Sequence, residues 1–186
     1  SKSRPVFQEC RTSGRIAEIK RGLDGDHLFL WRNPWDQWWS SKVTPYFDTA
    51  NQLIINAPSS PQPVQILLGC LALDSYQAVD ISGAFEFYYD HPLSSENSFL
   101  IFYMLWCLSL REGALYADLL INVDHLSDSG SYRNKICRNL ARMGIEGIEF
   151  DDCHIPQSTY TEQEKNFFLK LENQVHQWLI EGGWAE

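Results

Sequence analysis

Apolar and polar residues alternate in short runs along the first half of the chain. Charged and apolar residues alternate from Arg15 to Lys20, and a Gly-Leu-Asp-Gly-Asp turn leads into a second run from His27 to Trp31. A period of two is typical of half-buried strands, and a glycine-rich turn between two such runs indicates a hairpin. We therefore expect the chain to open with a β-hairpin.

More strands are expected before residue 90. Residues 52–57 have the composition of a strand, and the runs 64–73 and 78–89 flank an Asp74-Ser75 turn, which indicates a second hairpin. The run 64–73 is so apolar that it fits a helix equally well. The proline-rich segment 58–63 has the length of an ordinary loop, so it does not indicate a domain boundary.

From residue 94 onward the apolar residues recur every three or four positions. Ser94 or Ser95 can cap a helix that continues through Leu110 and ends at Gly113. A strand over 116–123 follows, and then a helix with one apolar face made of Tyr132, Ile136, Leu140 and Met143. A second strand is expected over 145–150. A Thr159–Glu162 capping box opens the last helix, whose apolar face consists of Phe168, Leu171, Val175 and Trp178.

The complete pattern predicts an α/β fold, with α+β as the alternative. N-terminal β-hairpins would be followed by a βαβα unit, and together they would form one mixed sheet with helices packed on it. The 186 residues, 44% of them hydrophobic, suffice for a single domain over 1–186. Residues 1–12 are expected to be a disordered or processed end.

Composition narrows the functional classes. The longest apolar run, 99–110, is about half of the ~20 residues that span a bilayer, so it predicts a buried helix and no membrane segment. The five cysteines are scattered without disulfide or metal spacing, which predicts reduced thiols and a cytoplasmic protein. The first residues lack the charged-then-apolar pattern of a signal segment, so export is not expected.

Charge points to the kind of partner. The formal charge of −9 argues against binding to nucleic acid or to an anionic membrane, because such proteins carry a basic surface. Residues 43–128 hold one basic residue, Arg111, among ten acidic ones. A protein partner with a basic surface is therefore expected.

Four tryptophans within nine residues form the first candidate site. Asn33 as a cap and Pro34 in the first turn predict a short helix over 35–41, which places Trp35, Trp38 and Trp39 on one face. That face either covers the core or, together with Arg32, forms a partner-binding patch, because Trp and Arg are enriched at binding hot spots.

The second candidate site lies where the strands 116–123 and 145–150 end. If these strands are parallel neighbours, their carboxyl ends bring together Asp124, His125, Asp151, Asp152 and His154. Carboxylates and imidazoles could hold a divalent metal, and Ser131, Arg133 and Lys135 at the start of the intervening helix could bind an anion. The alternative is structural, since Asp and Ser at strand ends often only cap the next helix.

Two functional hypotheses follow. The first is a soluble acidic interaction protein, for instance an inhibitor or immunity-type protein, that binds a basic protein partner through the aromatic patch and the acidic surface and needs no cofactor. The second is a metal-dependent hydrolase that acts on a phosphorylated or other anionic small substrate at the strand ends. No phosphate-binding loop, dinucleotide fingerprint, zinc-protease motif or nucleophile elbow is present in the sequence.

Overall fold

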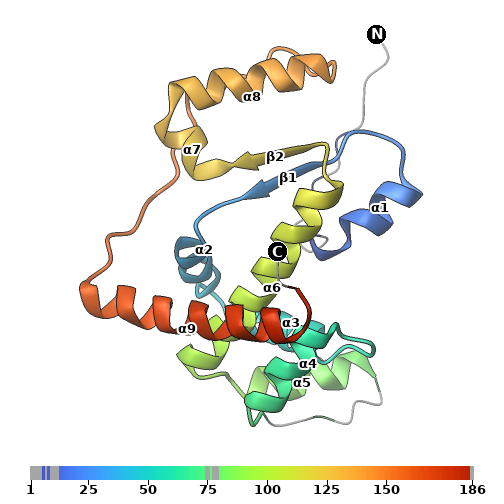
Figure 1. Cartoon of the computed structure of the whole chain (residues 1–186), viewed down its shortest axis with the longest axis vertical. Coiled ribbons are helices and arrows are strands. Elements are labelled where there is room, and N and C mark those ends of the chain that lie inside the picture. The colour runs from blue at the N-terminus through green and yellow to red at the C-terminus, as the bar shows by residue number, and fades with distance from the viewer. Residues whose placement is uncertain (1–5, 7, 9–12, 74–75, 77–79, 185–186) are drawn as a thin grey trace. The chain divides into compact units, whose positions relative to one another are not determined.

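The computed structural model describes residues 6, 8, 13–73, 76 and 80–184, and this part of the chain is mainly helical (Figure 1). The elements are η1 (Ser13–Arg15), α1 (Ile16–Gly22), β1 (Leu28–Trp31), α2 (Pro34–Ser41), α3 (Tyr46–Ile55), α4 (Gln62–Cys70), α5 (Ile81–Asp90), α6 (Ser95–Tyr116), β2 (Leu119–Asn122), α7 (Val123–Asp128), α8 (Gly130–Arg142) and α9 (Glu162–Glu181). The predicted α/β fold with hairpins and a mixed sheet is wrong.

The contacts divide the chain into two compact units. The first unit consists of Ser1–Arg32 and Cys107–Pro156, and the second consists of Asn33–Trp106 and Gln157–Glu186. The single domain over 1–186 stays a prediction. The expectation for residues 1–12 falls almost entirely outside the described residues.

The first unit is built on a parallel pair of strands. β1 and β2 lie side by side in Figure 1, in a register that runs from Leu28 opposite Leu119 to Trp31 opposite Asn122. Ile121 of β2 forms a buried cluster with Leu126 of α7 and with Ile136 and Leu140 of α8. Gly113 lets α6 pass close to β1, because a side-chain carbon there would lie 2.6 Å from the ring of Phe29. Gly113 is therefore a packing position and not the predicted end of the helix.

Two strands predicted for the first unit are absent from its described residues. Residues 16–22 form α1, because Ile16 and Ile19 also have helical spacing and Ile16 is buried. The segment 145–150 has no regular structure, since Gly144 and Gly147 have a φ of +73°, which interrupts an extended run. Its apolar residues Ile145 and Phe150 instead anchor an irregular segment against the buried cluster.

The second unit has an aromatic core. Trp38 and Phe168 lie at its centre with Phe99, whose ring centroid is 4.8 Å from that of Phe168 and 5.6 Å from that of Trp38. The predicted apolar face of the last helix is confirmed, because Phe168, Leu171, Val175 and Trp178 are all buried. α3 packs against α5, and α4 against α9.

Strand predictions in the second unit are also wrong. Residues 52–55 belong to α3, whose buried positions Thr49, Gln52 and Ile55 recur every three residues. Two of these three are polar, which hid the helical period. The ambiguous run 64–73 is mainly α4, and residues 81–89 of the second predicted hairpin lie in α5. Its Asp74-Ser75 turn and residues 77–79 lie outside the described residues.

The predictions of helix caps were more accurate than those of strands. The cap at Asn33 is confirmed, because its side chain accepts a hydrogen bond of 2.9 Å from the backbone N–H of Trp35 at the start of α2. The capping box of α9 is real but two residues later than predicted, between Thr161 and Glu164. Both signals are local, so they do not depend on tertiary packing.

α6 is the longest helix among the described residues. Its 22 residues and a mean hydropathy of 1.3 in its most apolar window would allow it to cross a membrane by length and composition alone. Half of that window is buried in the structure. Core helices of water-soluble proteins share these properties, so they are weak evidence for a membrane span.

Candidate functional site

The carboxyl ends of β1 and β2 form the first place where predicted site residues meet. Arg32 follows β1 and Asp124 follows β2, and the guanidinium Nε lies 3.5 Å from the carboxylate Oδ1. Arg32 also donates a hydrogen bond of 3.0 Å to the backbone carbonyl of Pro156. Both side chains are mostly buried. The ion pair joins the two strand ends, and the hydrogen bond to Pro156 ties them to the segment that follows α8.

The other candidates for a metal site do not join Asp124. His125 is exposed and packs edge-on against Tyr132, with ring centroids 5.4 Å apart. Asp151, Asp152 and His154 are exposed on the irregular segment after α8. Among the described residues, no group of three His, Cys, Asp or Glu side chains could hold a metal ion. The parallel strand that was to bring these residues together is absent there.

The predicted anion-binding residues lie at the start of α8, and two of them have other partners. The Ser131 hydroxyl is 3.0 Å from that of Ser129, the residue that caps α8. Arg133 donates to the carbonyls of Leu126 and Ser127 at 2.8 and 3.0 Å, so it closes the end of α7. Lys135 is exposed. Arg133 therefore has a structural role.

The tryptophan helix faces the core of the second unit. Trp38 is 2% exposed and donates a 3.0 Å hydrogen bond to Ser98, whereas Trp39 is 44% exposed. Trp35 stacks on Phe168 at 4.9 Å and donates to the Glu172 carboxylate at 2.5 Å. Of the three indoles on this helix, only Trp39 presents a large surface to a partner.

Glu172, which accepts the hydrogen bond from Trp35, has a shifted pKa. Burial raises the pKa of its carboxyl above the usual value, while the hydrogen bond from Trp35 and the nearby His176 lower it and only partly compensate. A raised pKa is often found at functional sites. Here the carboxylate is fixed by an indole that also packs in the core, which is the arrangement of a structural contact.

A buried polar network beneath Trp38 contains a serine and a lysine, the pair that some hydrolases use as nucleophile and base. Ser98 donates to Asp48 at 2.8 Å and accepts hydrogen bonds from Lys42 and from Trp38. Lys42 and Asp48 form an ion pair of 2.6 Å. Because Ser98 is 1% exposed and its hydroxyl donates to a carboxylate, this network holds α2, α3 and α6 together without offering a nucleophile.

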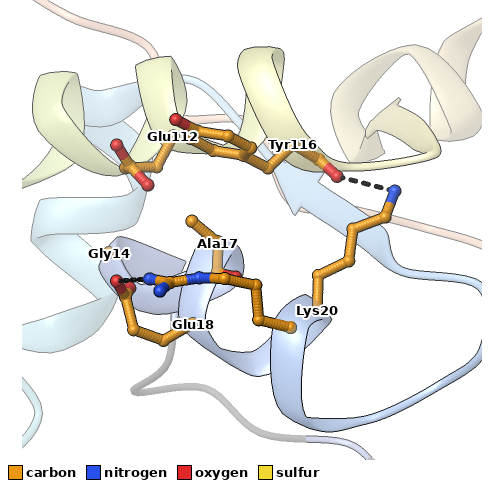
Figure 2. Close-up of a pocket in the computed structure, with 7 residues that line it drawn as sticks. Gly14, Ala17, Glu18, Lys20, Glu112 and Tyr116 are labelled. Carbon is orange, nitrogen blue, oxygen red and sulfur yellow. Dashed lines mark hydrogen bonds and ion pairs between the residues drawn. The ribbon is translucent and has the colours of Figure 1, made fainter.

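An open groove of about 600 Å³ lies in the first unit between α1 and the end of α6 (Figure 2). Glu112 and Tyr116 face it from α6, and Ala17, Glu18 and Lys20 face it from α1. Lys20 bridges the two helices, because its ammonium donates to the Tyr116 carbonyl at 3.1 Å and to Asp118 at 2.5 Å. Glu18 of the same groove pairs with Arg21, so most of the charges on the α1 side are engaged within the protein, and the groove is a junction between two helices.

The sequence did not reveal a run of aromatic rings on α3 and α5, the α3–α5 ridge, which consists of Tyr46, Phe47, Phe85 and Tyr89. Successive ring centroids are 5.6, 5.9 and 6.3 Å apart, from Phe47 through Tyr46 and Phe85 to Tyr89. Phe47 and Tyr89, at the two ends, are 39% and 51% exposed. The ridge was missed because it depends on the contact between Tyr46 of α3 and Phe85 of α5, and neither helix was predicted from the sequence.

Charge is divided unequally between the two units. The second unit carries 12 Asp and Glu against 3 Lys and Arg, whereas the first carries 12 against 12. The whole formal charge of −9 therefore lies on the second unit, which also carries the α3–α5 ridge. No protein-family model, curated protein or solved structure matches this chain.

Proposed function

We propose that this protein is an acidic binding protein whose second unit binds a protein partner with a basic surface. The observation that carries the proposal is the segregation of charge: the second unit has 12 acidic and 3 basic residues, whereas the first unit has 12 of each and is neutral. An inhibitor or immunity-type protein that binds a basic enzyme has these properties.

Electrostatics and exposed apolar side chains support the proposal together. A surface of one sign attracts partners of the opposite sign and rejects those of the same sign. Aromatic side chains near the centre of an interface then often supply a large share of the affinity. The second unit has both, since large apolar side chains are exposed on it, including Trp39, Phe47, Ile54, Ile81 and Tyr89.

The hydrolase alternative has lost its geometric basis. It required the strand 145–150 beside 116–123, and β2 pairs with β1 instead. Asp124, its central carboxylate, lies beside the guanidinium of Arg32. No observation on the described part of the chain now favours it.

The experiment compares two triple variants of the full chain that remove three negative charges each. One carries Glu86→Gln, Asp90→Asn and Glu181→Gln in the second unit, and the other carries Glu146→Gln, Glu149→Gln and Asp152→Asn in the first. All six side chains are exposed. Each protein is immobilised, proteins of the source cell are captured, and they are eluted with a salt gradient and identified by mass spectrometry.

We expect the captured proteins to be basic and to elute from the second-unit variant at lower salt than from the unaltered protein. The first-unit variant should retain them as the unaltered protein does. Capture of proteins without a basic surface, or equal weakening by the two variants, would refute the proposed function.

A further inference from the structure

The α3–α5 ridge combines exposed rings with carboxylates of the same helix. Glu86 lies three residues before Tyr89 on α5, and Asp90 lies four residues after Glu86, so the three side chains are neighbours on one helical surface. All three are exposed. Among the described residues, neither carboxylate has a Lys or Arg in an ion pair.

We infer that the α3–α5 ridge is the docking surface for the partner and that it binds an arginine-bearing apolar segment. The inference rests on the proposed function, because the acidic second unit must first attract a basic partner. It adds the position of the contact and the chemistry of the segment that is recognised.

Arginine fits this surface better than lysine does. A guanidinium can lie flat on the ring of Tyr89 while its edge donates hydrogen bonds to carboxylates beside that ring. An ammonium is a compact, strongly hydrated charge that cannot make a planar, two-pronged contact of this kind. Glu86 and Asp90, on either side of Tyr89 along α5, supply the acceptors.

The apolar part of the segment has its own contacts. Phe47 and Ile54 lie two helical turns apart on α3, and their side chains are 39% and 49% exposed. Ile81 lies two turns before Tyr89 at the other end of α5 and is exposed as well. An amphipathic segment can therefore cover apolar side chains of α3 while its arginine lies at Tyr89.

Asp90 gives an independent reason for a cationic occupant. It is the last residue of α5, where the helix dipole already carries partial negative charge. A carboxylate at this end is unfavourable in the free protein. A guanidinium from the partner would neutralise both the carboxylate and the helix end.

The test uses the full chain and two amphipathic peptides of equal length, one built from Leu and Arg and one from Leu and Lys. Binding is followed by fluorescence anisotropy at physiological salt. We expect the Arg peptide to bind about fivefold more tightly than the Lys peptide, as stacking on an exposed ring provides. Tyr89→Ala should abolish this preference.

Matched control variants distinguish binding at the ridge from attraction by the overall negative charge. Tyr116→Ala removes a tyrosine of similar exposure in the first unit and should leave the preference for Arg unchanged. Glu86→Gln with Asp90→Asn should weaken both peptides and reduce the salt dependence, whereas Glu146→Gln with Glu149→Gln should do neither. Thermal unfolding verifies that each variant is folded.

The two proposals fail differently. Equal binding of both peptides, unchanged by Tyr89→Ala, would overturn the inference about the ridge while salt-sensitive binding still supported an acidic binding protein. Absence of binding for both peptides would contradict the proposed function itself. A concentration-dependent dimer that Tyr89→Ala abolishes would make a second copy the occupant, through the exposed Arg138 and Arg142 of α8, and would also overturn the inference.

Discussion

Trp38 and Trp39 are adjacent in sequence and differ sharply in environment. Trp38 is 2% exposed among Phe99, Phe168 and the Ser98 hydroxyl, whereas Trp39 is 44% exposed. We predict that Trp38→Ala lowers the free energy of unfolding by about 3–5 kcal/mol, because it leaves a large cavity and breaks a buried hydrogen bond. Urea denaturation followed by circular dichroism measures this loss.

Trp39→Ala is the matched control, since it removes the same side chain one residue later. It should lower the free energy of unfolding by less than about 1 kcal/mol, as is usual for a surface position. Similar losses for the two variants would mean that the two indoles do not differ in burial, and that the tryptophan helix is oriented differently.

Glu172 predicts a dependence of stability on pH. Burial raises the pKa of this carboxyl in the folded protein above its unfolded value, so the folded state favours the protonated form. The stability that this group contributes is present below the unfolded pKa and is lost as pH rises through the raised folded pKa. Glu172→Gln keeps an acceptor for Trp35 but cannot ionise. We therefore predict that the variant gains stability over the unaltered protein between about pH 4 and pH 7.

Urea denaturation at several pH values measures that difference. If the difference in free energy of unfolding between the variant and the unaltered protein is the same at pH 4 and pH 7, Glu172 has the same pKa in the folded and unfolded states. Glu181→Gln, on an exposed side chain of the same helix, is the matched control for the substitution itself.

Asp118 joins three elements of the first unit and gives a prediction with the opposite sign. Its carboxylate accepts hydrogen bonds from Lys20 of α1 at 2.5 Å and from the backbone N–H of His27 before β1 at 2.9 Å. The hydrogen bond from Lys20 is the main cause that lowers the pKa of Asp118. Its contribution to stability is present above the unfolded pKa and is lost as pH falls through the lower folded pKa.

We predict that Asp118→Asn lowers the melting temperature at pH 7 and that the difference shrinks below about pH 4, where the unaltered carboxyl also becomes neutral. Differential scanning calorimetry across this range measures it. Asp151→Asn, which changes an exposed carboxylate of the same unit, is the matched control and should alter the melting temperature little. If the effect of Asp118→Asn persists undiminished at low pH, the charge of Asp118 is not what holds the strands to α1.

Helix-capping residues and prolines predicted helix starts well, because they act only on the adjacent turn. Asn33 with Pro34 predicted α2 correctly, because a cap and a proline act on the adjacent turn. Runs with a period of two wrongly predicted strands where tertiary packing determined the secondary structure. Thr49 and Gln52 are buried on α3 although they are polar. Ile145 and Phe150 were predicted to lie in a strand, but they pack an irregular segment against the buried cluster.

The candidate site illustrates the same limit. The rule that carboxyl ends of parallel strands meet at one edge does hold here, but it joins Arg32 to Asp124 and not Asp124 to Asp151. The sequence separation of β1 and β2 is about 90 residues, and nothing in either run specifies its partner. The α3–α5 ridge was likewise invisible, since it exists only when two helices pack together.

At the scale of the whole molecule, net charge does not describe either unit. A value of −9 suggests a moderately acidic protein, yet one unit is neutral and the other carries all of it. Like charges on a compact unit repel one another, and the repulsion lowers the stability of the folded state. This excess of negative charge on one unit is unfavourable for folding, and a role in binding a basic partner would explain it.

This reasoning predicts how salt and charge affect stability. Glu86→Gln with Asp90→Asn should raise the melting temperature at low ionic strength by about 2 °C, because it relieves repulsion and an adverse charge at the end of α5. The gain should shrink at high salt, where these charges are screened. Glu146→Gln with Glu149→Gln, in the neutral unit, should give a smaller gain at low salt. If the two pairs behave alike, the acidic residues of α5 carry no particular penalty, and the electrostatic argument for a cationic occupant at Asp90 loses its support.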